Sequence, residues 1–145
     1  AIGGTGSANT LDDYEEGTFT PELQIGGSTT GITYNSRNGH YTKVGRVVHI
    51  TMEIYLSSKG SQTGTLNIHG LPFSSASGIQ QSVHLYDDRF GNGGADNNQL
   101  YLSSNSTNFA LFEKDTDQAN NSRPQHDSLA NTSYLVVGGS YHISV

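Results

Sequence analysis

The chain has 145 residues, of which 32% are apolar and 14% are charged, and its thirteen acidic and seven basic residues give a net charge of -6. This acidic balance argues against nucleic acid as a partner, because phosphate binding needs a clustered basic surface. The chain has no cysteine for disulfides or thiolate sites, and no apolar run is long enough for membrane insertion.

Residues 1–17 are expected to form a lead-in linker from an upstream region, and residues 18–145 a single domain. Residues 1–10 are small and polar and lack the basic start and apolar block of a signal peptide. Four carboxylates crowd the end of the lead-in: Asp12, Asp13, Glu15 and Glu16. The first predicted strand then covers residues 18–24. Pro21 has no backbone N–H, so this strand should end there or lie at a sheet edge.

The strongest strand signal covers residues 46–56, where apolar and other residues alternate. One face carries Val48, Ile50, Met52, Ile54 and Leu56. The other face carries Val47, His49, Thr51, Glu53 and Tyr55. A slip of one residue would turn the whole apolar set to solvent, so we expect a central strand with a firm register.

The other predicted strands are shorter, and Gly, Asn, Asp or Pro separates them. They cover residues 31–34, 63–70, 82–86, 99–102, 108–113, 133–137 and 140–145. Turn residues at 35–39 and Gly138-Gly139 predict a turn and a hinge. No window shows a capped amphipathic helix. The pattern predicts an all-β fold, an antiparallel β-sandwich or jelly roll with almost no helix.

Residues 87–98 and 115–127 are the longest predicted loops, and both are rich in Asp and Asn. Long loops commonly cluster at the ends of β-sandwiches, where the scaffold holds them for recognition. Phe90 can stack there on a sugar ring, or it can instead fill the core. The full set of predicted ligand-binding residues is Phe90, Asp88, Arg89, Asn92, Asp96, Arg123, His126 and Asp127.

Other chemistries have weaker signals. The oxygen-rich loop 87–98 lacks the EF-hand spacing, so a turn is favoured over a calcium site. Four histidines face away from the apolar sets of their strands, where solvent exposure is favoured over a metal site at a three-fold axis: His49, His69, His84 and His142. The acidic cluster can pair with basic residues of a neighbouring chain (Lys43, Arg46 or Arg37) or stay solvated. We expect no catalytic residues, metal or cofactor, since no Gly-x-Ser-x-Gly motif or separated acid pair is present.

Four segments carry a resemblance to a known family. They are DDYEEGTFTP at residues 12–21, GHYTKVGRVV at 39–48, GLPF at 70–73 and GGSYHI at 138–143. In this order they resemble the C-terminal β-rich domain of bacteriophage tail fibres, tailspikes and related virion proteins. The resemblance implies a homotrimer located in the virion, and it favours inter-chain pairing of the acidic cluster. Residues 78–133 match no motif of the family.

The resemblance implies a non-enzymatic domain that attaches the virion to host cell-surface polysaccharide or lipopolysaccharide. The thin apolar content is also consistent with a core completed by partner subunits. The rival hypothesis is a trimerisation or folding-clamp module that binds no receptor. A glycan hydrolase is the third, because virion spikes often include one, but the chain is short for a β-helix and offers no convincing acid pair.

Overall fold

The structure is a computed structural model that describes residues 13–90, 97–114, 121–122 and 124–144. Its elements are β1 (Tyr14–Phe19), β2 (Glu22–Ile25), β3 (Thr33–Val44), β4 (Val47–Ser58), β5 (Leu66–His69), β6 (Gln81–Phe90), β7 (Asn97–Leu102), β8 (Phe109–Lys114), β9 (Asn121–Ser122), η2 (His126–Ser128) and β10 (Leu129–His142). In this part of the chain the short 3-10 segment η2 is the only helical element, so the all-β prediction is confirmed. No helix here is long and apolar enough to span a membrane.

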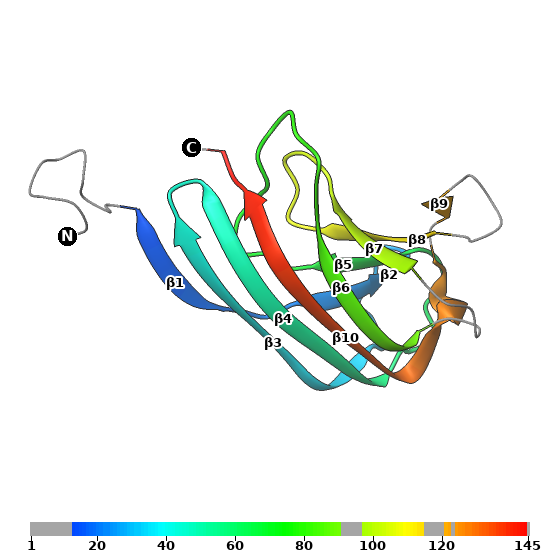
Figure 1. Cartoon of the computed structure of the whole chain (residues 1–145). Helices are drawn as coiled ribbons and strands as arrows, with labels where there is room; N and C mark the ends of the chain where they lie inside the picture. Colours follow the sequence, from blue (N-terminus) through cyan, green and yellow to red (C-terminus); the bar gives the residue numbers. More distant parts are fainter. Residues whose placement is uncertain (1–12, 91–96, 115–120, 123, 145) are drawn as a thin grey trace, which may run out of the picture.

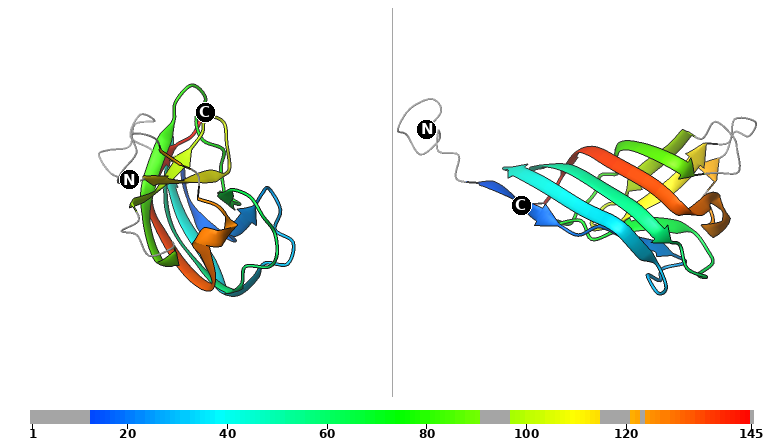
Figure 2. Two further views of the ribbon diagram at one scale, coloured as in Figure 1. Left: turned by 90° about the vertical axis from the view of Figure 1, so that its right-hand side faces the viewer. Right: turned by 90° about the horizontal axis from the view of Figure 1, so that it is seen from below.

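All the strands belong to one antiparallel ten-stranded sheet, with the order β1-β3-β4-β10-β6-β7-β8-β5-β2 and β9 added beside β8. The sheet curls so that its two halves face each other (Figures 1 and 2). Half A contains β1, β3, β4, β10 and residues 84–90 of β6, whereas half B contains residues 81–83 of β6 with β7, β8, β5 and β2. The architecture therefore differs from two separate sheets of a sandwich, because β6 passes from one half into the other.

The second crossing between the halves lies at Thr20 and Pro21. These residues separate β1, at the free edge of half A, from β2, at the free edge of half B. A proline interrupts a ladder because it cannot donate, so its place between two edge strands agrees with the sequence-based expectation. The chain thus joins the halves twice, through β6 within the sheet and through Thr20 and Pro21 between its two free edges.

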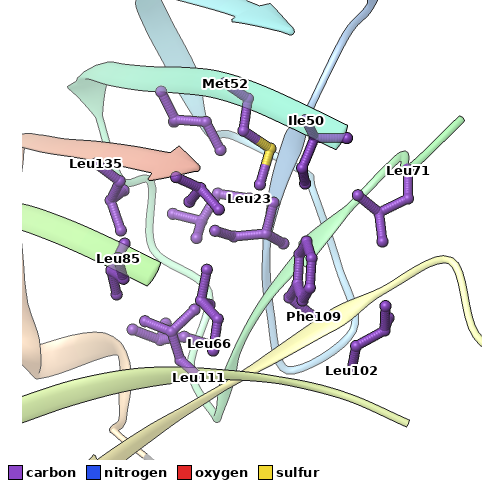
Figure 3. Close-up of a cluster of buried hydrophobic side chains, with 14 of the residues drawn as sticks. Leu23, Ile50, Met52, Leu66, Leu71, Leu85, Leu102, Phe109, Leu111 and Leu135 are labelled. Atoms are coloured by element: carbon purple, nitrogen blue, oxygen red, sulfur yellow. The ribbon is translucent and has the colours of Figure 1, made fainter. Parts of the chain in front are cut away.

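Strand β4 is central in half A, as predicted, and lies between β3 and β10. Its residues Val48, Ile50, Met52, Ile54 and Leu56 are all buried. Figure 3 shows Ile50 and Met52 above a cluster that contains Leu66, Phe109 and Leu111. The core therefore fills the space between the two halves, and residues of this one chain make it continuous.

The turn predicted at residues 35–39 is wrong, because β3 continues through it from Thr33 to Val44. Polar side chains that signal a turn instead bond to β4: Asn35 Nδ2 donates to the carbonyl of Leu56 at 3.0 Å, and Asn38 Nδ2 donates to Glu53 at 3.0 Å. The pairing of β3 with β4 is irregular only around Tyr34, where the register shifts. Tertiary pairing overrides the local turn preference here.

The pairing of β1 with β3 accounts for two of the four sequence motifs. Gly17 lies opposite Tyr41, and Phe19 lies opposite Gly39. Each aromatic ring covers the glycine across from it, since a Cβ added to Gly17 would meet Tyr41 at 2.8 Å and one added to Gly39 would meet Phe19 at 2.6 Å. The two motifs are therefore the two sides of one strand pair. This pair begins at Tyr14, earlier than the predicted strand start at residue 18.

Two further boundaries differ from the sequence-based expectations. Strand β10 runs unbroken from Leu129 to His142, without a hinge at Gly138-Gly139. Strand β6 extends to Phe90 and β7 begins at Asn97, so both ends of the predicted loop 87–98 are strand. The common cause is the length of β10, which pairs with β4 along one edge and with β6 along the other. The predicted pairing of residues 99–102 with 108–113 is confirmed by β7 and β8.

Candidate functional site

The structure divides the predicted ligand-binding residues among different places. Asp88, Arg89 and Phe90 lie on β6, where Phe90 pairs with Leu129. His126 and Asp127 lie in η2, and the backbone carbonyl of His126 accepts a hydrogen bond of 2.8 Å from Lys59. Asn92, Asp96 and Arg123 lie outside the described residues. Of the predicted set, Asp88 is the residue that the structure places in a described hollow.

This hollow lies on the face of half A that points away from the core, and we call it the outer-face hollow. It is open to solvent, has a volume of about 390 Å³ and is lined by Ser36, Glu53, Tyr55, Asp88 and Tyr134. Four of these residues form a single row across the sheet, because Ser36 pairs with Tyr55, Tyr55 with Tyr134, and Tyr134 with Asp88. Strands β3, β4, β10 and β6 each contribute one member of the row. Figure 2 shows these strands side by side from below.

Glu53 anchors the hollow through two donors. Asn38 donates to Oε1 at 3.0 Å, and the Tyr134 hydroxyl donates to Oε2 at 3.1 Å. The bonds from Asn38 and Tyr134 lower the pKa of Glu53, so it is a carboxylate at neutral pH. The hydrogen bond from Tyr134 to Glu53 also raises the pKa of the Tyr134 hydroxyl, which stays protonated. A carboxylate has about four acceptor sites, so Glu53 keeps capacity for hydroxyl groups of a ligand.

Aromatic rings form the apolar part of the hollow. The rings of Tyr55 and Tyr134 meet edge to face, with centroids 5.8 Å apart and planes 86° apart. Tyr86 lies one row further along, opposite Val136, and is 58% exposed. The three tyrosines come from adjacent strands β4, β10 and β6. They offer flat apolar area and hydroxyl groups at low conformational cost.

A second hollow of about 320 Å³ adjoins the first on the same face. It is lined by Asn38, His40, Thr51, Met52, Glu53 and Val136. The two hollows share Glu53, so its carboxylate borders both. Together they extend along the strands and suit an elongated ligand more than a compact one.

The described part of the chain offers no group of three or more His, Asp or Glu residues that could hold a metal ion. Two predicted outer-face histidines, His49 and His84, are exposed on half A. The combination of rings, hydroxyls and acceptors in the outer-face hollow is chemistry for binding polar ligands.

Asp13, Glu15 and Glu16 of the acidic cluster bond within their own chain, whereas the sequence favoured pairing between chains, and Asp12 lies outside the described residues. Asp13 forms an ion pair with Lys43, and Glu15 accepts a hydrogen bond of 2.6 Å from the Tyr41 hydroxyl. Glu16 accepts from Tyr14 at 2.7 Å. These contacts follow from the pairing of β1 with β3, which puts Glu15 opposite Lys43. Arg37 pairs instead with Glu22, at 2.6 Å.

Comparisons with known proteins point to bacteriophage tails. No family model matches the chain. Over 72 residues the chain is 40% identical to the protein "Depolymerase, capsule KN4-specific" of Klebsiella phage K64-1, which covers 49% of this chain and 10% of that protein. The crystal structure of the Dettilon tailspike protein matches 89% of this chain with a TM-score of 0.74 and 20% identity. The comparisons support a phage tailspike-type domain.

The chain spans only part of each relative, namely 10% of the depolymerase and 24% of the Dettilon chain. At 20% identity the Dettilon match shows a common fold and no more. The relatives are phage tailspike and depolymerase proteins, which are virion tail components, and the predicted virion location agrees with this.

Sequence reasoning missed most of the outer-face hollow. It placed Glu53 and Tyr55 on the outward face of their strand, which the structure confirms. It gave them no role, because their partners Tyr134 and Asp88 lie far along the chain. The signal was present in part, since tyrosine with Asp and Asn is typical of carbohydrate-binding surfaces. The sequence predicted ligand-binding residues in long loops, whereas the hollow is built on strands.

Proposed function

We propose that this chain is a non-enzymatic module of a phage tail fibre or spike that binds host cell-surface polysaccharide through the outer-face hollow. The row of Tyr55 and Tyr134 beside the charged Glu53 carries the proposal. Rings can stack on the apolar faces of sugars, and the carboxylate accepts their hydroxyls. The rigid strands hold these groups without an ordering cost at binding. Lipopolysaccharide presents the same sugar chemistry and is the second host ligand of this class.

The capsule specificity in the name of the phage K64-1 depolymerase supports the choice of ligand. The predicted loop set remains a second proposed contact region. Asp88 links the two regions, because it lines the outer-face hollow and lies two residues before Phe90 on β6.

Replacing Tyr134 by alanine tests this function. We expect the chain to bind at least one member of a panel of purified capsular polysaccharides, beginning with capsule type KN4, and Tyr134→Ala to weaken that binding about tenfold or more. The loss of one stacked aromatic ring accounts for an effect of this size. Isothermal titration calorimetry measures the binding, and thermal melting checks that the variant is folded.

Tyr101→Ala is the matched control. Tyr101 is a half-exposed tyrosine in half B whose ring meets Phe112 edge to face at 5.6 Å, so the same truncation is made away from the hollow. Equal losses of binding in the two variants, or no binding by the unaltered chain to any polysaccharide of the panel, would contradict the proposal.

A structural role in trimer assembly is the second candidate function, and an exposed apolar row favours it. Tyr14 pairs with Val44, and Val44 pairs with Val47, at the end of half A. These side chains are 51%, 43% and 38% exposed. Apolar side chains gathered at one place on a surface are typical of contacts between proteins. Since the core is continuous within one chain, the case for a trimer now lies in this surface.

Light scattering tests the assembly. We expect the chain, of 15.5 kDa, to have the mass of a trimer, and Val47→Lys to shift it toward the monomer. Ile79→Lys is the control, because Ile79 is 50% exposed but lies outside the row. A stable monomer of the unaltered chain would rule out the homotrimer.

A further inference from the structure

The charges around the outer-face hollow bear on which sugars can enter it. Glu53 lines both hollows of the outer face, and its bonds to Asn38 and Tyr134 keep it ionised at neutral pH. Asp88 adds a second carboxyl group to the lining of the first hollow. Neither lining includes a Lys or Arg whose side chain the structure describes.

The two cations of strand β3, Arg37 and Lys43, are engaged elsewhere. Arg37 pairs with Glu22 and covers the ring of Tyr34 at 4.4 Å, and it lines a different hollow. Its Cα partner on β4 is the buried Ile54, so Arg37 belongs to the core-facing side of β3. Lys43 pairs with Asp13 near the start of β1. These contacts leave the carboxylate of Glu53 without a neighbouring positive charge from Arg37 or Lys43.

We infer that the sugar units bound in the outer-face hollow are uncharged hexoses, whose hydroxyls donate to Glu53, and that uronic acids are excluded from it. This inference depends on the proposed polysaccharide binding. In a polymer whose repeating unit contains both kinds of sugar, the neutral unit occupies the hollow and the acidic unit lies outside. A ligand carboxylate about 5 Å from Glu53 weakens binding about fourfold even at the dielectric constant of bulk water, because like charges repel.

Carboxyl reduction of the polysaccharide tests the inference, since it converts uronic acids into neutral hexoses without altering the rest of the polymer. The probe is an acidic capsular polysaccharide of the panel that the chain binds, in its native and its carboxyl-reduced form. We expect the reduced form to bind at least as tightly as the native form. Any gain on reduction should shrink as salt is raised from about 20 mM to about 500 mM, because salt screens exposed charges.

Glu53→Gln provides the matched variant, because glutamine keeps the shape and removes the charge. In this variant the ratio of the affinities for the reduced and the native polymer should fall toward one. Its melting temperature should stay close to that of the unaltered chain. Loss of binding on carboxyl reduction would overturn the inference and leave polysaccharide binding standing. Failure of every polysaccharide to bind would instead overturn the proposed function itself, and the inference with it.

Discussion

Ile54→Ala is expected to lower the free energy of unfolding by about 2–5 kcal/mol, the range for large-to-small changes in a protein core. Ile54 is 1% exposed and lies on the central strand β4, opposite Leu135 of β10. The loss combines the buried area of the side chain with the cavity that remains, since strands on both sides prevent the sheet from collapsing. Denaturant unfolding followed by circular dichroism measures the change.

Thr51→Ala is the control for this prediction. Thr51 lies on the same strand but on its exposed face, so its truncation should alter stability by less than about 0.5 kcal/mol. If Thr51→Ala proved as damaging as Ile54→Ala, the two faces of β4 would not have the unequal roles that burial gives them.

Gly39→Ala is expected to lower the free energy of unfolding by about 1–3 kcal/mol, because it overfills a packed site. An added Cβ would lie 2.6 to 2.8 Å from three atoms of the Phe19 ring, closer than non-bonded carbon atoms approach in proteins. Gly39 is itself buried, so the ring has to move and β1 with it. Thermal and denaturant unfolding of the variant measure the cost.

A double variant separates this clash from other effects of the substitution. With Phe19→Ala in the same chain, the added methyl group has room, so Gly39→Ala should cost less than in the unaltered background. Gly138→Ala is the control glycine, because a Cβ added at this position of β10 would have nothing within 4 Å. Additive losses in the double variant would show that the ring of Phe19 is not the cause.

Local patterns predicted the fold well where one face of a strand is buried and the other is not. The alternation along residues 46–56 identified β4, its inward residues and its central place, because register is firm when a slip exposes an apolar set. Patterns failed where long-range pairing overrides local preference. Asn35 and Gly39 are typical turn residues, yet β4 pairs along this segment of β3 and β1 joins it at Gly39, so the segment stays extended.

The site was predictable only in fragments for the same reason. Tyr55 could be placed on an outward face from its own strand. Tyr134 reaches it through the pairing of β10 with β4, a contact between residues far apart in the chain. Periodicity reports which way a side chain faces and carries no information about which strand lies alongside. The hollow is a property of strand order, which four short motifs do not specify.

The place of β10 has a consequence for the synthesis of this protein. The ribosome makes β10 last of the ten strands, yet β10 lies between β4 and β6 and joins them. The hairpin of β3 and β4 can form early, because its contacts are local, whereas β4 is not joined to β6 until residues 129–142 have been translated. An interrupted chain keeps two open strand edges, which invite aggregation and recognition by chaperones. The core can therefore be completed only after residues 129–142 have been translated.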